Sequence, residues 1–312
     1  MPKISIIIPT YNRRELVREA IASVMAQSYR DFELIVVDDG SEDRTAAIVH
    51  EFAGVRYVYQ PNRGVSAARN HGVALSSGEL IAFLDSDDLW QPRKLEHQVL
   101  FFVTYPEVPI CQTEEIWLRN GVRVNPHNKH RKTGGDLFAR SLERCLVSPS
   151  TVMLSRDLFE RIGGFDESLS VCEDYDLWLR ITATMPVHLI EIPLVIKRGG
   201  HADQLSHRFW GMDRFRVATL CKLLESGMLS MEQRRLTEQM LRKKCTILVQ
   251  GARNRGQDDE RYLALIAAYT STEDEKLETD RKNIILNRAE RSEESLFLSA
   301  ARGELLRFAQ ND

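Results

Sequence analysis

Several features that would assign this chain to a specialised class are missing from its 312 residues. The five cysteines are odd in number, widely spread and never in a CxxC spacing, which argues against a zinc site or a disulfide framework. No stretch approaches the roughly 18 apolar residues that a membrane span needs. The formal net charge is only -3, which argues against a dedicated nucleic-acid binder.

The composition is that of an ordinary soluble globular protein, with 43% hydrophobic and 28% charged residues. The start of the chain holds one lysine and a short apolar run stopped by Pro9, which is too short for a signal sequence. Together with the unpaired cysteines, this favours a cytoplasmic protein, and peripheral contact with the inner face of a membrane stays open. The length predicts roughly two structural units.

Strand-like and helix-like patterns alternate through the first hundred residues. This alternation predicts βαβ units, and therefore an α/β fold with a mainly parallel nucleotide-binding sheet flanked by helices. Each apolar strand run ends in polar or turn residues, and ligands of open α/β sheets bind beyond the carboxyl ends of the strands. The side chains expected along that edge are Pro9, Thr10, Tyr11, Asp38, Asp39, Asp85 and Asp87.

The pattern changes in the second half of the chain. A helix is expected after Pro92, then strands at 148–155 and 189–201 with helices at 156–165 and 172–185. From about residue 207 only helical patterns remain. We therefore expect a catalytic domain at 1–205, a helical appendage at 206–285 and a disordered or non-domain tail at 286–312.

Residues 234–255 carry seven arginines and lysines against the single acid Glu238. Such a segment could attract an anionic lipid or a phosphorylated acceptor. It could equally be a solvated helix face, and we favour that interpretation.

The stretch IAFLDSDDLW places three carboxylates directly after a buried strand. Asp85 and Asp87 flank Ser86, so in an extended chain their side chains point the same way. Two carboxylates in a small space favour a bound cation, and a hard divalent ion with oxygen ligands suits the pair. The alternative is an acidic turn in which Asp88 caps the helix near Pro92.

A second acidic pair, Glu173 and Asp174, stands at the predicted start of a helix. Acids at this position often serve only as partners of the helix dipole. If the fold brings Asp174 toward the first cluster, it could instead act as a general base.

Six ordered blocks of sequence are similar to glycosyltransferase family 2, the inverting nucleotide-sugar enzymes with the A-type fold. They are SIIIPTYN, VVDDGSEDRT, NRGVSAARNHG, GELIAFLDSDDLWQP, GGFDESL and EDYDLWLR. The resemblance spans about residues 3–205 and does not reach the helical part.

The resemblance implies a donor site at the first four strands. Pro9, Thr10 and Tyr11 would line the nucleotide pocket, and Asp39 would accept a hydrogen bond from the base. Arg69 would approach the base or the diphosphate. Further residues with an implied role in holding the donor or its Mn²⁺ or Mg²⁺ ion are Asp85, Asp87 and His201.

The resemblance also implies an acceptor site and a reaction. Asp174 would deprotonate the acceptor hydroxyl, so that a single displacement inverts the anomeric centre. The residues implied at the acceptor are Gly163, Gly164, Glu173 and Trp178. UDP is the first choice of nucleotide, and the acceptor is expected to be a saccharide or lipid-linked molecule of surface polysaccharide or lipopolysaccharide synthesis.

Three other classes of protein are alternatives to this interpretation. An aspartyl phosphotransfer enzyme fits FLDSDD, but Leu89 stands where such enzymes need Thr or Val, and the DDGS block would have no role. A dinucleotide-binding oxidoreductase would need a GxGxxG motif after the first strand, and none is present. A non-catalytic carbohydrate-binding or scaffold protein with the same fold stays open, although the expected metal ligands and base are all present.

Overall fold

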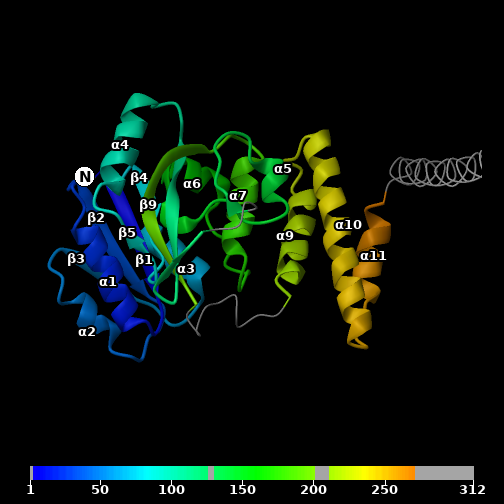
Figure 1. Cartoon of the computed structure of the whole chain (residues 1–312), viewed down its shortest axis with the longest axis horizontal. Helices are drawn as coiled ribbons and strands as arrows, with labels where there is room; N and C mark the ends of the chain where they lie inside the picture. The colour runs from blue at the N-terminus through cyan, green and yellow to red at the C-terminus, as the bar shows by residue number, and fades with distance from the viewer. Residues whose placement is uncertain (1–2, 126–129, 201–210, 271–312) are drawn as a thin grey trace, which may run out of the picture. The chain divides into compact units, whose positions relative to one another are not determined.

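The computed structural model describes residues 3–125, 130–200 and 211–270, which form one sheet with helices packed on it and a helical C-terminal part (Figure 1). The described strands follow the order β3-β2-β1-β4-β8-β6-β9-β5, and β7 pairs with β6. Their bounds are β1 Ile4–Thr10, β2 Phe32–Asp38, β3 Val55–Tyr59, β4 Leu80–Phe83, β5 Leu89–Trp90, β6 Ile110–Arg119, β7 Val122–Val124, β8 Val152–Ser155 and β9 His188–Gly199. The helices are α1 Arg14–Met25, α2 Thr45–Val49, α3 Val65–Ala74, α4 Lys94–Thr104, α5 Phe138–Ser141, α6 Arg156–Ile162, α7 Glu173–Thr182, α9 Asp213–Glu225, α10 Met231–Asn254 and α11 Glu260–Ala268, with a 3₁₀ turn η2 at Pro149–Thr151.

The first four strands are parallel, as the sequence predicts. In the register of β1 and β2, Thr10 lies opposite Asp38, and β4 runs parallel to β1 on its other side. The carboxyl ends of all three strands therefore lie at one edge of the sheet. The remaining strands form a mixed arrangement, because β8 runs antiparallel to β4 and to β6 whereas β9 runs parallel to β6.

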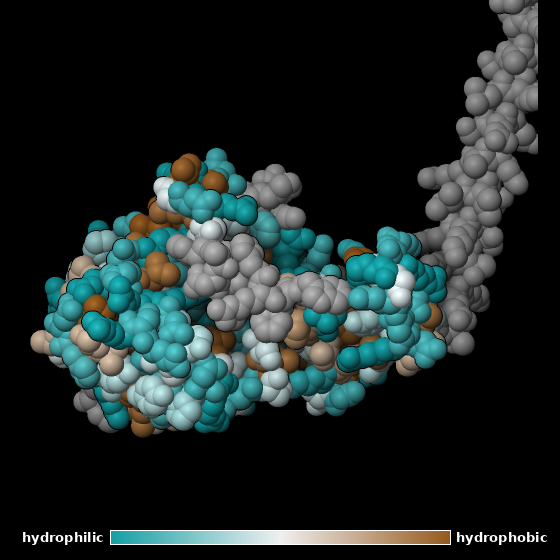
Figure 2. Space-filling view, turned by 90° about the horizontal axis from the view of Figure 1, so that it is seen from below, coloured by the Kyte–Doolittle hydropathy of each residue, from teal (hydrophilic) through white to brown (hydrophobic). Residues whose placement is uncertain are grey.

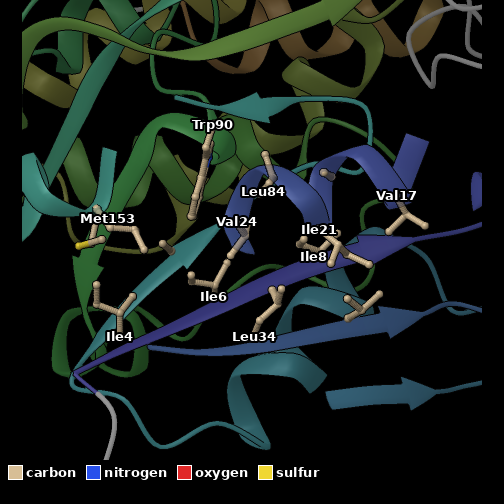
Figure 3. Packing of buried hydrophobic residues seen from close by; sticks show 14 of the residues in the cluster. Ile4, Ile6, Ile8, Val17, Ile21, Val24, Leu34, Leu84, Trp90 and Met153 are labelled. Atoms are coloured by element: carbon tan, nitrogen blue, oxygen red, sulfur yellow. The ribbon is translucent and has the colours of Figure 1, made fainter. Parts of the chain in front are cut away.

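Strand β1 is buried on both faces, which explains its continuous apolar sequence. On one face, alternate residues from Ile4 to Ile8 pack with the apolar sides of α1 and α2 (Figure 3). On the other face, Ile7 packs in a cluster with residues of α3, α6 and α7. Apolar clusters thus cover both faces of the sheet, and the loops after its strands are anchored to this packed core.

The helical C-terminal part begins with α9, which packs against α7. The chain divides into two compact units, Met1–Lys244 and Cys245–Asp312. The predicted boundary between 205 and 206 and the predicted tail 286–312 lie outside the described residues. Among the helices that the structure describes, none is long and apolar enough to cross a membrane.

Several cations of the basic segment 234–255 are paired with acids. Arg234 lies 3.0 Å from Glu238, and the side chain of Lys244, which is only 5% exposed, lies 2.9 Å from Asp213. On the face shown in Figure 2, hydrophilic side chains predominate and apolar ones are scattered. Arg234 and its partner agree with a solvated helix face, whereas Lys244 is buried, and neither belongs to a bare basic patch.

Candidate active site

The acidic turn Asp85–Asp88 follows β4 at the carboxyl edge of the parallel strands, and basic side chains hold it. Asp85 Oδ1 accepts a hydrogen bond from Arg69 Nη2 at 2.7 Å, and Asp87 Oδ2 accepts one from Arg13 Nη1 at 3.0 Å. The side chains of Asp85 and Asp87 are 28% and 14% exposed. Both carboxylates therefore keep access to a ligand at this edge.

Asp88 has a different environment from its two neighbours. It is buried, its Oδ2 accepts from Ser150 Oγ at 2.7 Å, and its Oδ1 accepts from the backbone N–H of Arg198 at 2.9 Å. Burial raises the pKa of Asp88 to about 8, and the charge of Asp87 adds to the rise. The alternative interpretation, in which Asp88 caps the next helix, is wrong, because α4 follows Arg93 without a side-chain cap. Asp88 instead ties the turn to η2 and β9.

Arg69 links the acidic turn to the start of α7. The residue is 3% exposed, its Nη1 donates to Glu173 Oε1 at 2.7 Å and its Nη2 donates to Asp85. The guanidinium carbon lies 4.9 Å from the ring centre of Phe165. Burial lowers the pKa of Arg69, but Asp85 and Glu173 raise it by more, so the group stays charged. The structure therefore shows Arg69 joining two carboxylates, and its expected approach to the base or the diphosphate stays a prediction.

The two acids at the start of α7 separate in space. Glu173 is buried and faces Arg69, and its expected place at an acceptor stays a prediction. Asp174 Oδ1 accepts from the backbone N–H of Tyr175, and its Oδ2 accepts from the Cys145 thiol at 3.3 Å. Burial and the charge of Asp174 raise the pKa of Cys145, so the thiol keeps its proton. Glu173 and Asp174 both begin α7. Because Arg69 binds Glu173 and Asp85, it connects the start of this helix to the acidic turn.

The two aspartates after β2 hold loops. Asp39 accepts hydrogen bonds from Gln60 Nε2 at 2.7 Å and from the backbone N–H groups of Arg63 and Gly64 at 2.9 and 2.8 Å. Asp38 accepts from the Ser41 N–H and the Tyr57 hydroxyl. A carboxylate can accept about four hydrogen bonds, so Asp39 has little capacity left for a nucleotide base. Its expected contact with the base stays a prediction.

A pocket of about 460 Å³ lies beside this loop. Its wall includes Gln60, whose Oε1 is 2.8 Å from His71 Nδ1 while its amide donates to Asp39. The other lining residues are Tyr59, Pro61, Arg63, Ala67, Asn70, Ala74 and Glu167. A chain of hydrogen bonds thus runs from this pocket to Asp39.

The end of β1 has an unsatisfied polar group. Thr10 is 3% exposed, and its hydroxyl has no hydrogen-bond partner among the described residues. Pro9 is buried in the strand, whereas Tyr11 is partly exposed at the edge. Since a buried hydroxyl without a partner is costly, the Thr10 hydroxyl favours a polar ligand at this place.

Three of the residues expected at the acceptor have clear structural roles, and their expected contact with an acceptor stays a prediction. Gly163 and Gly164 end α6 with φ values of 85° and 67°, in the left-handed region where glycine is preferred. Trp178 is 1% exposed and packs edge-on against Phe165 in the core. Trp178 lies on the side of α7 that packs against the sheet.

The candidate ligands of a divalent metal ion are Asp85, Asp87 and His201. Within the residues that the structure describes, no group of three His, Cys, Asp or Glu side chains is placed to hold a metal ion. Asp85 and Asp87 alone fit Mg²⁺ or Mn²⁺ if phosphate oxygens complete the shell, as these ions commonly bind through one or two carboxylates. His201 lies outside the described residues.

Several residues near the acidic turn were not predicted from the sequence. Ser150, from η2, donates to Asp88 and accepts from the backbone N–H of Asp85 at 3.2 Å. On β9, Arg198 donates to the carbonyl of Asp87, and Lys197 lies beside it. The only sequence signal was two consecutive cations at the end of an apolar strand. Their contact with the turn depends on the pairing of β5 with β9.

Comparisons with known proteins place this geometry in a family. The profile described as Glycosyl transferase family 2 matches residues 5–163. An uncharacterized glycosyltransferase of Rickettsia typhi is 35% identical over 212 residues, which are 66% of this chain and 66% of that protein. The chain thus spans just under two thirds of the length of that relative.

A relative with a more specific name is the Escherichia coli UDP-Glc:alpha-D-GlcNAc-diphosphoundecaprenol beta-1,3-glucosyltransferase WfgD. It is 35% identical over 181 residues, which are 57% of this chain and 69% of that protein.

Among solved structures, the mannosyltransferase PcManGT from Pyrobaculum calidifontis, in complex with GDP-Man and Mn²⁺, is similar with a TM-score of 0.58 and 20% identity. The likeness covers 91% of this chain and 81% of that one, and it concerns the fold. This chain belongs to glycosyl transferase family 2 and has the A-type glycosyltransferase fold.

Proposed function

We propose that this chain transfers a sugar from a nucleoside diphosphate sugar to an acceptor hydroxyl, with inversion at the anomeric carbon. The observation that carries the proposal is the bridge of Arg69 between Asp85 and Glu173, at 2.7 Å on each side. This bridge links Asp85, one of the two candidate cation ligands, to the start of the helix that carries Asp174, which supports the proposal that these groups belong to one site. A transferase needs both groups at the same place, because the donor and the acceptor must meet.

The chemistry follows from the residue types. Asp174 takes the proton of the acceptor hydroxyl while the acceptor oxygen bonds to the anomeric carbon. The bond from that carbon to the diphosphate breaks, and the electron pair leaves with the diphosphate. Asp85 and Asp87 would hold Mn²⁺ or Mg²⁺, which supplies charge stabilisation for the departing group.

The donor and acceptor classes are proposed from the relatives. WfgD is named for UDP-Glc and a lipid-linked acceptor, and PcManGT was solved with GDP-Man and Mn²⁺. UDP is therefore our first candidate and GDP the second. The acceptor is a saccharide or lipid-linked saccharide of surface polysaccharide or lipopolysaccharide synthesis, handled in the cytoplasm at the inner face of the membrane.

Calorimetric titration of UDP, dTDP and GDP tests the donor site. Each nucleotide is added to the protein with Mn²⁺ and with a chelator, and then to Asp87→Asn. The matched control is Asp157→Asn on α6, whose side chain is 79% exposed. Binding of one nucleotide that needs Mn²⁺ and Asp87, and not Asp157, supports the proposal and names the donor class. No binding of any nucleotide by the unmodified protein overturns it and favours a carbohydrate-binding or scaffold protein.

A further inference from the structure

Strand β9 brings Lys197 next to the acidic turn. The following residue, Arg198, donates its backbone N–H to Asp88 Oδ1 at 2.9 Å and its side chain to the carbonyl of Asp87. Lys197 Nζ lies 3.3 Å from the hydroxyl of Ser148, just before the turn η2 that binds the other oxygen of Asp88. Lys197 thus lies on β9 and contacts the residue before η2, and these are the two segments that bind Asp88.

The ammonium group of Lys197 has unused hydrogen-bonding capacity. Among the described residues, Ser148 Oγ is its single hydrogen-bond acceptor, although an ammonium carries three donors. The nearby Lys132 differs, because its Nζ has acceptors in Gln112, Leu146 and Thr151 and an ion pair with Glu115 at 3.5 Å. Lys132 is thus satisfied by the protein, whereas Lys197 keeps donors for a ligand.

The pKa of Lys197 is influenced by carboxylates of the acidic turn and of the start of α7. Burial lowers the pKa of Lys197, but Glu115 and three aspartates raise it above its ordinary value; the aspartates are Asp88, Asp85 and Asp174. The group is therefore a permanent cation at neutral pH. If Asp85 and Asp87 hold the metal ion and Asp174 is the base, the departing diphosphate would lie near this cation.

We propose that Lys197 is a further catalytic residue, whose ammonium binds the diphosphate of the donor and stabilises the charge that this group gains on leaving. The proposal rests on the proposed function. A lysine suits this task because it is a compact cation with rotatable donors. As the bond between the anomeric carbon and the diphosphate oxygen breaks, the electron pair moves to that oxygen, close to the fixed cation. A merely structural role, in which Lys197 only offsets the surrounding acids, is the competing explanation.

Paired nucleotides separate the two explanations. UDP and UMP, and GDP and GMP, are titrated with Mn²⁺ into the unmodified protein, Lys197→Met and Lys197→Arg. The control is Lys3→Met. Lys3 precedes β1, at the edge of the sheet opposite to the acidic turn, and pairs with Glu79. We expect Lys197→Met to weaken diphosphate binding about 10- to 100-fold, to weaken monophosphate binding much less, and Lys197→Arg to retain most of the affinity.

The outcomes are distinct. If the unmodified protein binds no nucleotide, the proposed function fails before Lys197 is tested. If it prefers the diphosphate and Lys197→Met keeps that preference, or weakens both nucleotides equally, Lys197 has only a structural role and the inference is overturned.

A second measurement does not depend on a variant. The unmodified protein is labelled with ¹⁵N-lysine, and the Nζ resonance of the Lys197 ammonium is followed by NMR with Mg²⁺ alone, with UMP and with UDP, or with the guanine pair if GDP binds. We expect the diphosphate to shift this resonance more than the monophosphate does, while the resonance of Lys132, whose donors are used by the protein, changes less. A Lys197 resonance that is the same with and without saturating diphosphate contradicts the proposal.

Discussion

Arg69 and Glu173 form a buried ion pair, Nη1 to Oε1 at 2.7 Å, although 104 residues separate them in the chain. The same guanidinium binds Asp85, so one cation fixes the distance between the turn after β4 and the start of α7. Glu173 is buried, and burying a carboxylate without a charged partner is costly, so Arg69 stabilises it in this position. The Arg69 guanidinium thus joins the turn after β4 to the start of α7.

Replacing Arg69 should therefore damage both folding and site geometry. We expect Arg69→Met to lower the free energy of unfolding by about 3–5 kcal/mol, since it leaves two carboxylates without their partner. Arg69→Met combined with Glu173→Leu should recover part of this loss. Urea unfolding at pH 7 measures both values. A loss below about 1 kcal/mol would mean that the pair contributes little.

Asp174 is expected to act in the reaction and not in nucleotide binding. Asp174→Asn keeps the size of the side chain and should lower the transfer rate about 10²- to 10⁴-fold, because a general base is lost. Calorimetry should give an unchanged nucleotide affinity. The control is Asp157→Asn, on an exposed face of α6. Turnover that persists in Asp174→Asn would assign the base to another residue.

Lys94 should make stability depend on pH. It is 0% exposed, lies 4.0 Å from the ring centre of Trp90, and burial lowers its pKa to about 7. An unfolded lysine has a pKa of about 10.4, so between these values the unfolded chain binds more protons and the free energy of unfolding rises with pH. From pH 7 to 9, we expect this rise to be about 2 kcal/mol larger in the unmodified protein than in Lys94→Met.

Urea unfolding of both proteins at pH 7, 8 and 9 measures this difference. Cys111, whose pKa burial raises to about 12, is present in both proteins and cancels in the comparison. Parallel curves for the two proteins would show that Lys94 is charged in the folded state.

The two glycines after α6 should differ in their tolerance of alanine. A Cβ on Gly163 would meet no atom within 4 Å, whereas one on Gly164 would lie 2.9 Å from Asn70 Oδ1. Gly163→Ala should cost about 1–2 kcal/mol for its left-handed backbone alone. Gly164→Ala should cost more, because it also displaces the Asn70 side chain, which bonds the backbone of Phe165. Thermal unfolding of both variants tests the order, and equal losses would contradict it.

The order of the motifs along the chain was sufficient to predict the fold of the first four strands. Apolar runs that alternate with amphipathic helices can pack only as a parallel sheet with helices on its faces, and this fixes where Thr10, Asp38 and Asp85 lie. The antiparallel pairing of β8 with β4 could not be predicted in this way. Short strands far apart in the sequence carry no local sign of their partners.

The residue types of the site were determined by the sequence, and their partners by the tertiary structure. The sequence identified Asp85, Asp87 and Asp174 as candidates because they stand in the ordered blocks that resemble the family, although acids after a strand or at a helix start also have local explanations. Only the fold decided that Arg69 binds Asp85 and Glu173, and that Lys197 lies beside the turn. Ion pairs and hydrogen bonds act over a few ångströms in space, and long-range contacts of this kind leave no periodic pattern in the chain.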